Sequence, residues 1–271
     1  MINLKLGYVT NCWGGVVGHP GGVTSVKDAY YLANGSTEEA LSDLNSLGYQ
    51  GFEIFDGNLM QYENSKEDFK NLMKKNELTL IGVYTGANFI YDEILDEELA
   101  KINKVAHLAN EFGAKHLVIG GGAIRSAGIN DTDYKKLGDA LEKVKVVAEN
   151  HNLLASYHPH LGSTVETIEQ TRELIKHTSI HLCPDTAHLQ AAGSDPAEFI
   201  KEFKDRIQYV HLKDFGNDNF QPLGEGTQNL TQVIKELKHM NYNGWITVEL
   251  DSYYDPKEGA KISKNYLQKN L

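Results

Sequence analysis

Histidines and acids follow four successive β-rich stretches in the later part of the sequence, at the point where each stretch ends. These residues are His158 and His160, Asp185 and His188, His211 and Lys213, and Glu249 and Asp251. Side chains two positions apart on an extended strand share a face, so His211 and Lys213 point the same way. Pro159 holds His158 extended, so the two histidines that flank this proline share a direction as well. The spacing therefore aims carboxylates and imidazoles from four strands toward one place.

A divalent metal site is the chemistry that such a set of groups favours. Carboxylates buried together without a cation repel one another and are costly to desolvate. We expect Asp185, His211 and Glu249 to be ligands, since they stand at the ends of three successive strands. Several carboxylate oxygens and an imidazole suit Mn²⁺, Mg²⁺ or Co²⁺ better than a closed structural Zn²⁺ site.

The fourth ligand should come from the region of the fifth strand. Glu166 is the leading candidate, although it lies beyond the strand, at the start of the next helix, so its loop must fold back. His158 and His160 are the alternatives.

Other polar residues near the strand ends are candidates for substrate contact. Lys213 and His188 would orient or polarise substrate oxygens, and His158 would add a further contact. Glu53 follows the second strand, where it either meets substrate or pairs with a neighbouring strand. Glu225 lies in a glycine-flanked turn after the seventh strand, a place from which it reaches substrate.

A rim ion pair is the alternative interpretation for Lys213. The next residue is Asp214, and an exposed lysine and aspartate would pair at the surface with little consequence.

The elements that must position these residues alternate between strand and helix along the whole chain. Eight strands are predicted, over 4–10, 51–56, 78–84, 116–122, 153–159, 180–186, 207–215 and 244–250. Between them, apolar residues recur at helical spacing, and helix start signals stand at Ser36 with Glu39, at Asp195 with Pro196 and, more weakly, at Thr164 with Thr167. This alternation indicates βαβ units on a parallel sheet.

A single (β/α)₈ barrel over residues 1–271 is the expected architecture. Eight units close naturally into a barrel, and 271 residues is an ordinary length for one. The alternative, an open doubly wound sheet, would show a GxGxxG fingerprint after its first strand, which NCWGGVVGHPGG does not fit. In a barrel, chemistry lies at the carboxyl ends of the strands, where the polar residues are found.

Composition and charge limit the classes of binding partner that the protein is expected to have. The net charge is −11, so the average surface repels nucleic acid and anionic membranes. No apolar stretch is long enough to span a bilayer or to form a secretory signal, and Cys12 and Cys183 form no disulfide pattern. We expect a cytoplasmic protein that acts on a small molecule, with homo-oligomerisation left open.

The motifs resemble those of the xylose-isomerase-like TIM-barrel superfamily, which includes sugar phosphate isomerases, epimerases and inosose dehydratases. The stretches that carry the resemblance are GYQGFEIF, YHPHLGSTVET, CPDTAHLQAAGSDP, YVHLKDF, LGEG and GWITVEL, and they span strands two to eight.

The resemblance implies one divalent metal, commonly manganese, held by two glutamates, an aspartate and a histidine. It assigns Asp185, His211 and Glu249 to the ligand positions of strands six to eight. Many members carry the remaining glutamate on strand five, where this sequence has Ser156 and Tyr157. The YHPHLGSTVET form is closer to the inosose dehydratase branch, so the role passes to Glu166.

The expected chemistry is enolisation next to a carbonyl, with a metal-stabilised ene-diolate. The main hypothesis is a sugar isomerase or epimerase that acts on a ketose or keto-polyol, with Glu166, Glu249 or a histidine as the base. The closest alternative is dehydration of 2-keto-myo-inositol type, with His160 or Lys213 as the acid. An apurinic endonuclease, which the acidic net charge disfavours, and a silent sugar-binding subunit are the remaining alternatives.

Overall fold

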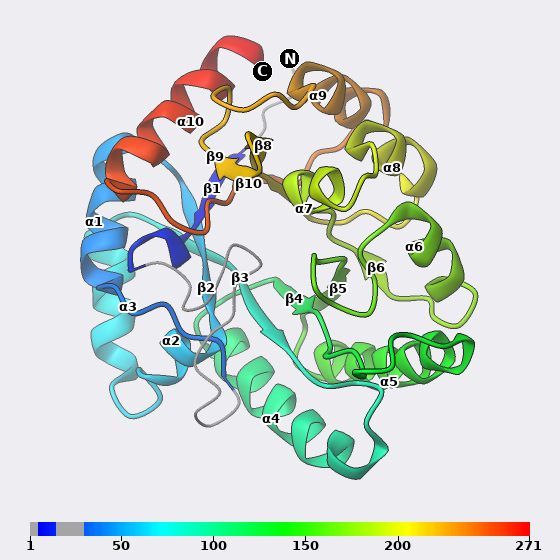
Figure 1. Ribbon diagram of the computed structural model, residues 1–271. Helices are drawn as coiled ribbons and strands as arrows, with labels where there is room; N and C mark the ends of the chain where they lie inside the picture. The colour runs from blue at the N-terminus through cyan, green and yellow to red at the C-terminus, as the bar shows by residue number, and fades with distance from the viewer. Residues whose placement is uncertain (1–4, 15–29) are drawn as a thin grey trace.

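Eight parallel strands form the centre of the computed structural model, which describes residues 5–14 and 30–271. In spatial order they are β6 (His181–Leu182), β5 (Leu154–His158), β4 (His116–Gly120), β3 (Thr79–Gly86), β2 (Gly51–Phe55), β1 (Lys5–Val9), β10 (Trp245–Val248) and β7 (Val210–Leu212). The sheet curls on itself, with helices outside it (Figure 1). The predicted TIM-barrel fold is confirmed.

The two edge strands of this sheet meet through a thin seam. Isolated parallel bridges join Leu182 to Ile207 and Asp185 to His211. The His211 amide donates to the Pro184 carbonyl at 3.0 Å, and the bridges bring β6 and β7 side by side. Two expected metal ligands therefore face each other across the seam.

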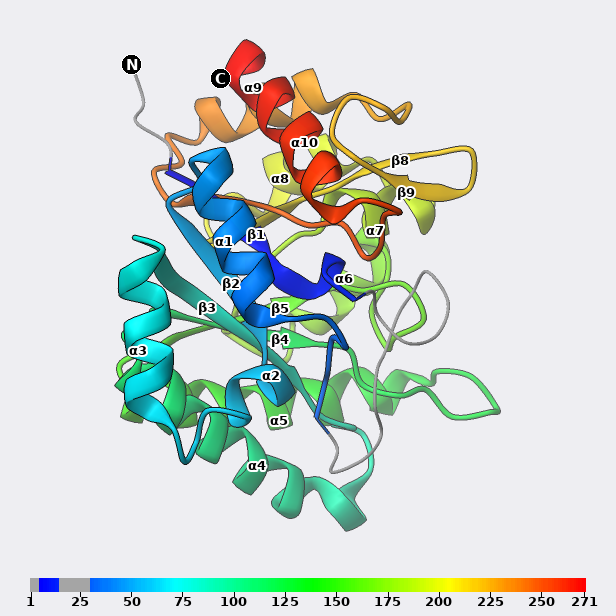
Figure 2. The same cartoon turned by 90° about the vertical axis from the view of Figure 1, so that its left-hand side faces the viewer.

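Ten α-helices and one short 3₁₀ helix are found in the described residues. They are η1 (Thr10–Cys12), α1 (Thr37–Leu47), α2 (Asp56–Met60), α3 (Lys66–Lys75), α4 (Asp92–Glu111), α5 (Asp131–Asn150), α6 (Ile168–Leu174), α7 (Thr186–Ala191), α8 (Pro196–Phe203), α9 (Leu230–His239) and α10 (Pro256–Asn270). The last helix packs against α1, which brings the two ends of the barrel sequence together (Figure 2). Among the described residues, none of these helices has the length and apolar character needed to cross a bilayer.

The helix starts follow local capping chemistry. The Ser36 hydroxyl accepts the Glu39 amide, and the Asp195 carboxylate accepts two amides of α8, as the sequence predicts. The weaker signal was misplaced by one turn, because Thr167, with Gln170, forms the capping box of α6. Thr164 lies before it, in the loop.

Two predicted strands differ from the structure. The stretch 207–215 contains β7 and then breaks at Lys213, after which β8 (Asp214–Gly216) pairs antiparallel with β9 (Asn219–Gln221) as a hairpin. The stretch 180–186 keeps only two strand residues, because α7 begins at Thr186. Of the segment NCWGGVVGHPGG, residues 15–22 lie outside the described part of the chain.

Candidate metal centre

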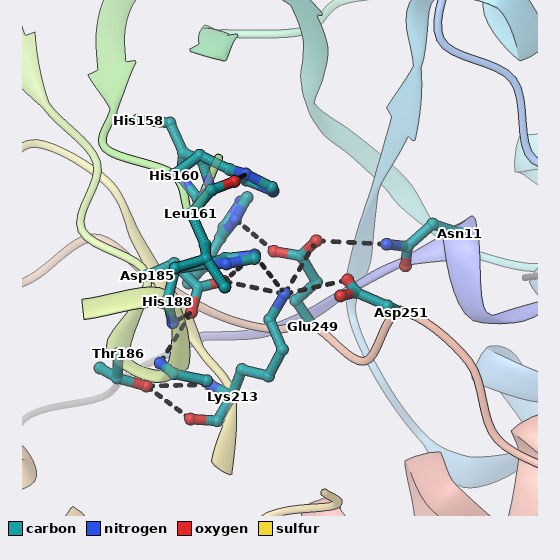
Figure 3. A network of polar contacts seen from close by, with 12 residues as sticks. Asn11, His158, His160, Leu161, Asp185, Thr186, His188, Lys213, Glu249 and Asp251 are labelled. Carbon is teal, nitrogen blue, oxygen red and sulfur yellow. Dashed lines mark hydrogen bonds and ion pairs between the residues drawn. The ribbon is translucent and has the colours of Figure 1, made fainter. Parts of the chain in front are cut away.

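Four side chains from four neighbouring elements converge at the carboxyl end of the barrel. His158 ends β5, Asp185 follows β6, His211 lies on β7, and Glu249 follows β10. All four are buried, and each offers one ligand atom within 4.8 Å of those of the others. Figure 3 shows Asp185 and Glu249 at the end of the Lys213 side chain. His158, one of the alternatives for the fourth ligand, thus takes the strand-five place in the cluster.

The atoms that face one another in this cluster meet only charged neighbours or, for His158 Nε2, no polar partner among the described residues. Within the described residues, His158 Nε2, Asp185 Oδ2, His211 Nδ1 and Glu249 Oε2 are buried and make no hydrogen bond. Their closest approach is an ion-pair contact of 2.7 Å between His211 Nδ1 and Glu249 Oε2. Buried polar atoms left without partners are costly, and a divalent cation between them would satisfy all four. The donor set therefore fits a metal ion.

The opposite atoms of the same side chains are already held. His158 Nδ1 lies 3.0 Å from the Cys183 carbonyl, so Nδ1 carries the proton and Nε2 presents a lone pair to the cluster. Asp185 Oδ1 accepts the amides of Ala187 and His188 at 2.8 and 3.0 Å, as the N-cap of α7. These contacts fix which atom of each group faces the centre.

Glu249 is oriented by a residue that the sequence reasoning did not single out. The Asn11 side-chain amide, just beyond β1, donates to Glu249 Oε1 at 3.2 Å. A polar residue directly after the first strand was the signal that could have identified it, since the ends of all eight strands meet at this mouth.

Lys213 is fully buried between three carboxylates and an imidazole. Its ammonium lies 3.1 Å from Asp185 Oδ2, 3.4 Å from Glu249 Oε1 and 3.0 Å from Asp251 Oδ1. It also lies 3.2 Å from His188 Nε2. Burial alone would lower the pKa of Lys213, but the surrounding carboxylates raise it above its ordinary value, so the side chain is a cation.

Burial and crowding raise the pKa values of two of these carboxyl groups. Desolvation raises the pKa of Asp185 to about 6 and that of Asp251 to about 7, against the opposing effect of the Lys213 charge. Burial raises the pKa of Asp251 enough to place its titration near neutral pH, where proton transfer is most effective.

Two further histidines form a layer beside the cluster, above Lys213. The rings of His160 and His188 lie 3.7 Å apart, and desolvation lowers the pKa of His160 to about 4 and that of His188 well below its usual value. Both imidazoles are therefore neutral. His160 Nδ1 lies 2.8 Å from the Leu161 carbonyl and must carry the proton, which leaves Nε2 as a proton acceptor.

The neighbouring histidine has the opposite tautomer. His188 Nε2 accepts from the Lys213 ammonium, so Nδ1 carries the proton and is free to donate. Phe220, from the β8–β9 hairpin, packs against His188 and Lys213. Its ring lies 4.8 Å from the His188 ring and 4.7 Å from the Lys213 ammonium. A proton acceptor and a proton donor thus stand side by side at one mouth.

The structure does not bring two of the predicted site residues to this mouth. Glu166 accepts a hydrogen bond from the Gly162 amide of its own loop, which turns its carboxylate away from the cluster. Glu53 is fully buried beneath His211, with its Oε2 3.0 Å from His211 Nε2. His158 rather than Glu166 therefore stands with Asp185, His211 and Glu249 in the cluster, and Glu53 contacts a residue of another strand, the second of the two roles considered for it.

The remaining predictions concern the outer loops. Glu225 is exposed at the rim, where its carboxylate accepts a 3.4 Å bond from the Tyr253 hydroxyl. The rim ion pair considered for Lys213 and Asp214 does not form, because Lys213 points inward and the Asp214 carboxylate accepts backbone amides instead.

Fold and site together define a class of protein, a parallel (β/α)₈ barrel with an acid and imidazole cluster at the carboxyl ends of its strands. The chain belongs to the xylose isomerase-like TIM barrel family, whose model matches residues 41–270. This match confirms the family that the motifs resemble.

Relatives and solved structures agree with this assignment. The chain is 27% identical over 270 residues to the inosose dehydratase of Geobacillus kaustophilus (strain HTA426), covering 86% of each protein. It is similar in fold to the 3-keto-D-glucoside 4-epimerase YcjR of E. coli, with TM-score 0.75, 18% identity and coverage of 98% of this chain and 100% of that chain. It is likewise similar to an IOLI protein with a bound zinc atom, with TM-score 0.77, 19% identity and 99% coverage of both chains.

Proposed function

We propose that the chain is a divalent-metal-dependent enzyme that removes a proton next to the carbonyl of a keto-polyol or ketose. The observation that carries this proposal is the convergence of four buried ligand atoms, from His158, Asp185, His211 and Glu249, beside a buried ammonium. The inosose dehydratase relative supports the substrate class, since its name describes a keto-polyol.

His158, Asp185, His211 and Glu249 would hold the metal. When bound, a divalent metal supplies a Lewis acid that polarises the substrate carbonyl. Manganese is our first choice. Zinc is the main alternative, because two imidazoles and two carboxylates suit it and the IOLI structure contains it.

The chain's own residues would move the protons. His160 Nε2, which carries no proton, accepts the hydrogen from the carbon next to the carbonyl. The Lys213 ammonium and the His188 Nδ1 proton donate to substrate oxygens, which holds the substrate against the cluster. Asp251, whose pKa is raised to about 7 by burial, balances the Lys213 charge and relays a proton near neutral pH.

Dehydration is the outcome that the observations favour. The C–H bond electrons form a carbon–carbon double bond, the hydroxyl on the next carbon accepts a proton from His160 or Lys213, and it leaves as water. The first support is the inosose dehydratase relative. The second is that strand five carries Ser156 and Tyr157 where an additional carboxylate base would stand.

Isomerisation or epimerisation is the second candidate, because the same site returns the proton to carbon instead. The tautomers of the two histidines support this candidate, because a proton donor, His188, and a proton acceptor, His160, lie close together. Their ring centres are 3.7 Å apart. Both outcomes begin with the same C–H bond.

Incubation of the purified protein with manganese and a panel of inososes and ketoses in D₂O tests the proposal. Dehydration raises ultraviolet absorbance from an enone-type product, whereas isomerisation or epimerisation places deuterium in a recovered sugar. The variant H160Q should lose either activity by at least about 100-fold, while H239Q, which changes an exposed histidine on α9, should keep it. A metal-loaded protein that yields neither signal with any member of the panel contradicts the proposal.

Other sequence-based expectations stay predictions. They are a single domain over residues 1–271, a cytoplasmic location, a homo-oligomer and the absence of nucleic acid as a substrate.

A further inference from the structure

A row of buried polar side chains runs beneath the proposed metal centre through the interior of the barrel. The Thr247 and Tyr209 hydroxyls form a hydrogen bond of 2.7 Å, and Tyr209 lies next to the Glu53 carboxyl group. Glu53 Oε2 lies 3.0 Å from His211 Nε2. All four residues are fully buried.

The contact between Glu53 and His211 has only one direction available. An ionised carboxylate accepts and never donates, so the contact with His211 requires a proton on Nε2. A metal can then bind His211 only through Nδ1, the nitrogen that faces Glu249 Oε2 at 2.7 Å, in exchange for the proton there.

From this geometry, and resting on the proposed metal-dependent function, we infer that Glu53 is a positioning residue for the metal centre. It fixes the tautomer and the ring plane of His211, so that Nδ1 is the ligand atom. A second carboxylate behind a ligating imidazole is a general means of tuning metal affinity. Among the described residues, Glu53 forms an ion pair with His211 alone, and its burial without such a role would be costly.

A glutamine at position 53 removes the fixed direction of the contact with His211 while keeping the size of the side chain. Its amide presents one acceptor and one donor, so it can turn its NH₂ group toward His211 and force the Nε2 lone pair to face it. The His211 proton would then move to Nδ1 and block the ligand atom. Tyr209→Phe differs, because Glu53 remains an acceptor on both oxygens and the His211 tautomer is kept.

Zinc titration of the purified full chain against a chromophoric chelator, with ¹⁵N-histidine NMR of the same samples, tests this inference. We expect Glu53→Gln to weaken zinc binding by about 10- to 100-fold and to change the His211 tautomer. Tyr209→Phe should stay within about threefold, as should Glu98→Gln, which removes another buried glutamate, one that bonds Asn88 away from the site.

Wild-type protein alone also decides the point if Glu53→Gln does not fold. Zinc-loaded wild type should show His211 with its proton on Nε2 and the metal on Nδ1. A proton on Nδ1, or a Glu53→Gln variant with wild-type zinc affinity and tautomer, overturns the inference while leaving metal binding intact. A wild-type chain that binds no divalent metal overturns the proposed function and this inference together.

Discussion

Lys213 already occupies the electrostatic position that a metal cation would share. Its ammonium contacts Asp185 and Glu249, two proposed ligands, and also Asp251. The Thr186 hydroxyl holds its backbone from both sides, accepting its amide at 3.0 Å and donating to its carbonyl at 2.7 Å. The lysine and the metal are thus expected to stabilise the same negative charges.

Replacing Lys213 by methionine tests whether the lysine and the metal stabilise the same carboxylates. K213M leaves buried carboxylates without a cation, so we expect the free energy of unfolding without metal to fall by about 3–5 kcal/mol. Added manganese should then raise the Tm of K213M by more than it raises that of wild type. Thermal unfolding with and without manganese measures both effects.

Lys257→Met is the matched control for this variant. Lys257 pairs with Asp43 at the surface, and such pairs contribute about 0–1 kcal/mol. An equal manganese response in K213M and wild type would show that the lysine and the metal do not share these carboxylates.

Whether a site residue could be predicted depended on whether it stands on a strand or in a loop. Asp185, His211 and Glu249 stand on or directly after strands, where a period of two fixes their direction, and they converge as expected. Glu166 stands on a loop, and no periodicity shows that the Gly162 amide binds its carboxylate. The two roles considered for Glu53 could not be separated from the sequence, because its contact with His211 joins residues that are 158 positions apart.

At the scale of elements, the loop after β7 is organised by one buried carboxylate. Asp214 accepts the amides of Phe215, Gly224, Gly226 and Gln228, at distances between 2.8 and 3.2 Å. These bonds tie the β8–β9 hairpin to the glycine-rich turn, and the hairpin holds Phe220 over His188. The wall of the site therefore depends on Asp214.

Asp214→Asn should loosen this wall. Asparagine keeps one acceptor oxygen but turns an NH₂ group toward backbone amides, so we expect a loss of about 1–3 kcal/mol in stability. Hydrogen exchange over residues 214–228 should increase, and KM should rise more than kcat falls. Asp218→Asn, at the exposed turn of the same hairpin, should change neither, and equal effects of the two variants would contradict this role.

The hairpin also shows where element prediction stopped. Alternating barrel strands and helices follow from local periodicity, and all eight strands were located. The break at Lys213 was not, because VHLKDF reads as one extended stretch. Its interruption is set by the antiparallel pairing of Phe215 with Phe220, a contact that the one-dimensional pattern does not contain.

For the molecule as a whole, the proposed metal site lies where two neighbouring strands of the barrel form no continuous backbone ladder. Strands β6 and β7 are joined by two isolated bridges, and the second of these joins Asp185 to His211, two of the proposed ligands. A metal held by both would tie the seam through side chains where the backbone ladder is sparse. Metal binding should therefore stabilise the closed barrel, and not only the site.

Metal removal should loosen this seam before the rest of the sheet. At a free metal concentration of about 100 Kd, binding adds about 2.7 kcal/mol to the free energy of unfolding, which chelation removes. Hydrogen exchange should speed up most at the Leu182 and His211 amides, which bond across the seam to Arg206 and Pro184, and least in β2 and β3. In D185N, which keeps an acceptor for the α7 amides but lacks the charge, the chelator should have little effect. A uniform change across all eight strands would mean that the metal does not close the barrel.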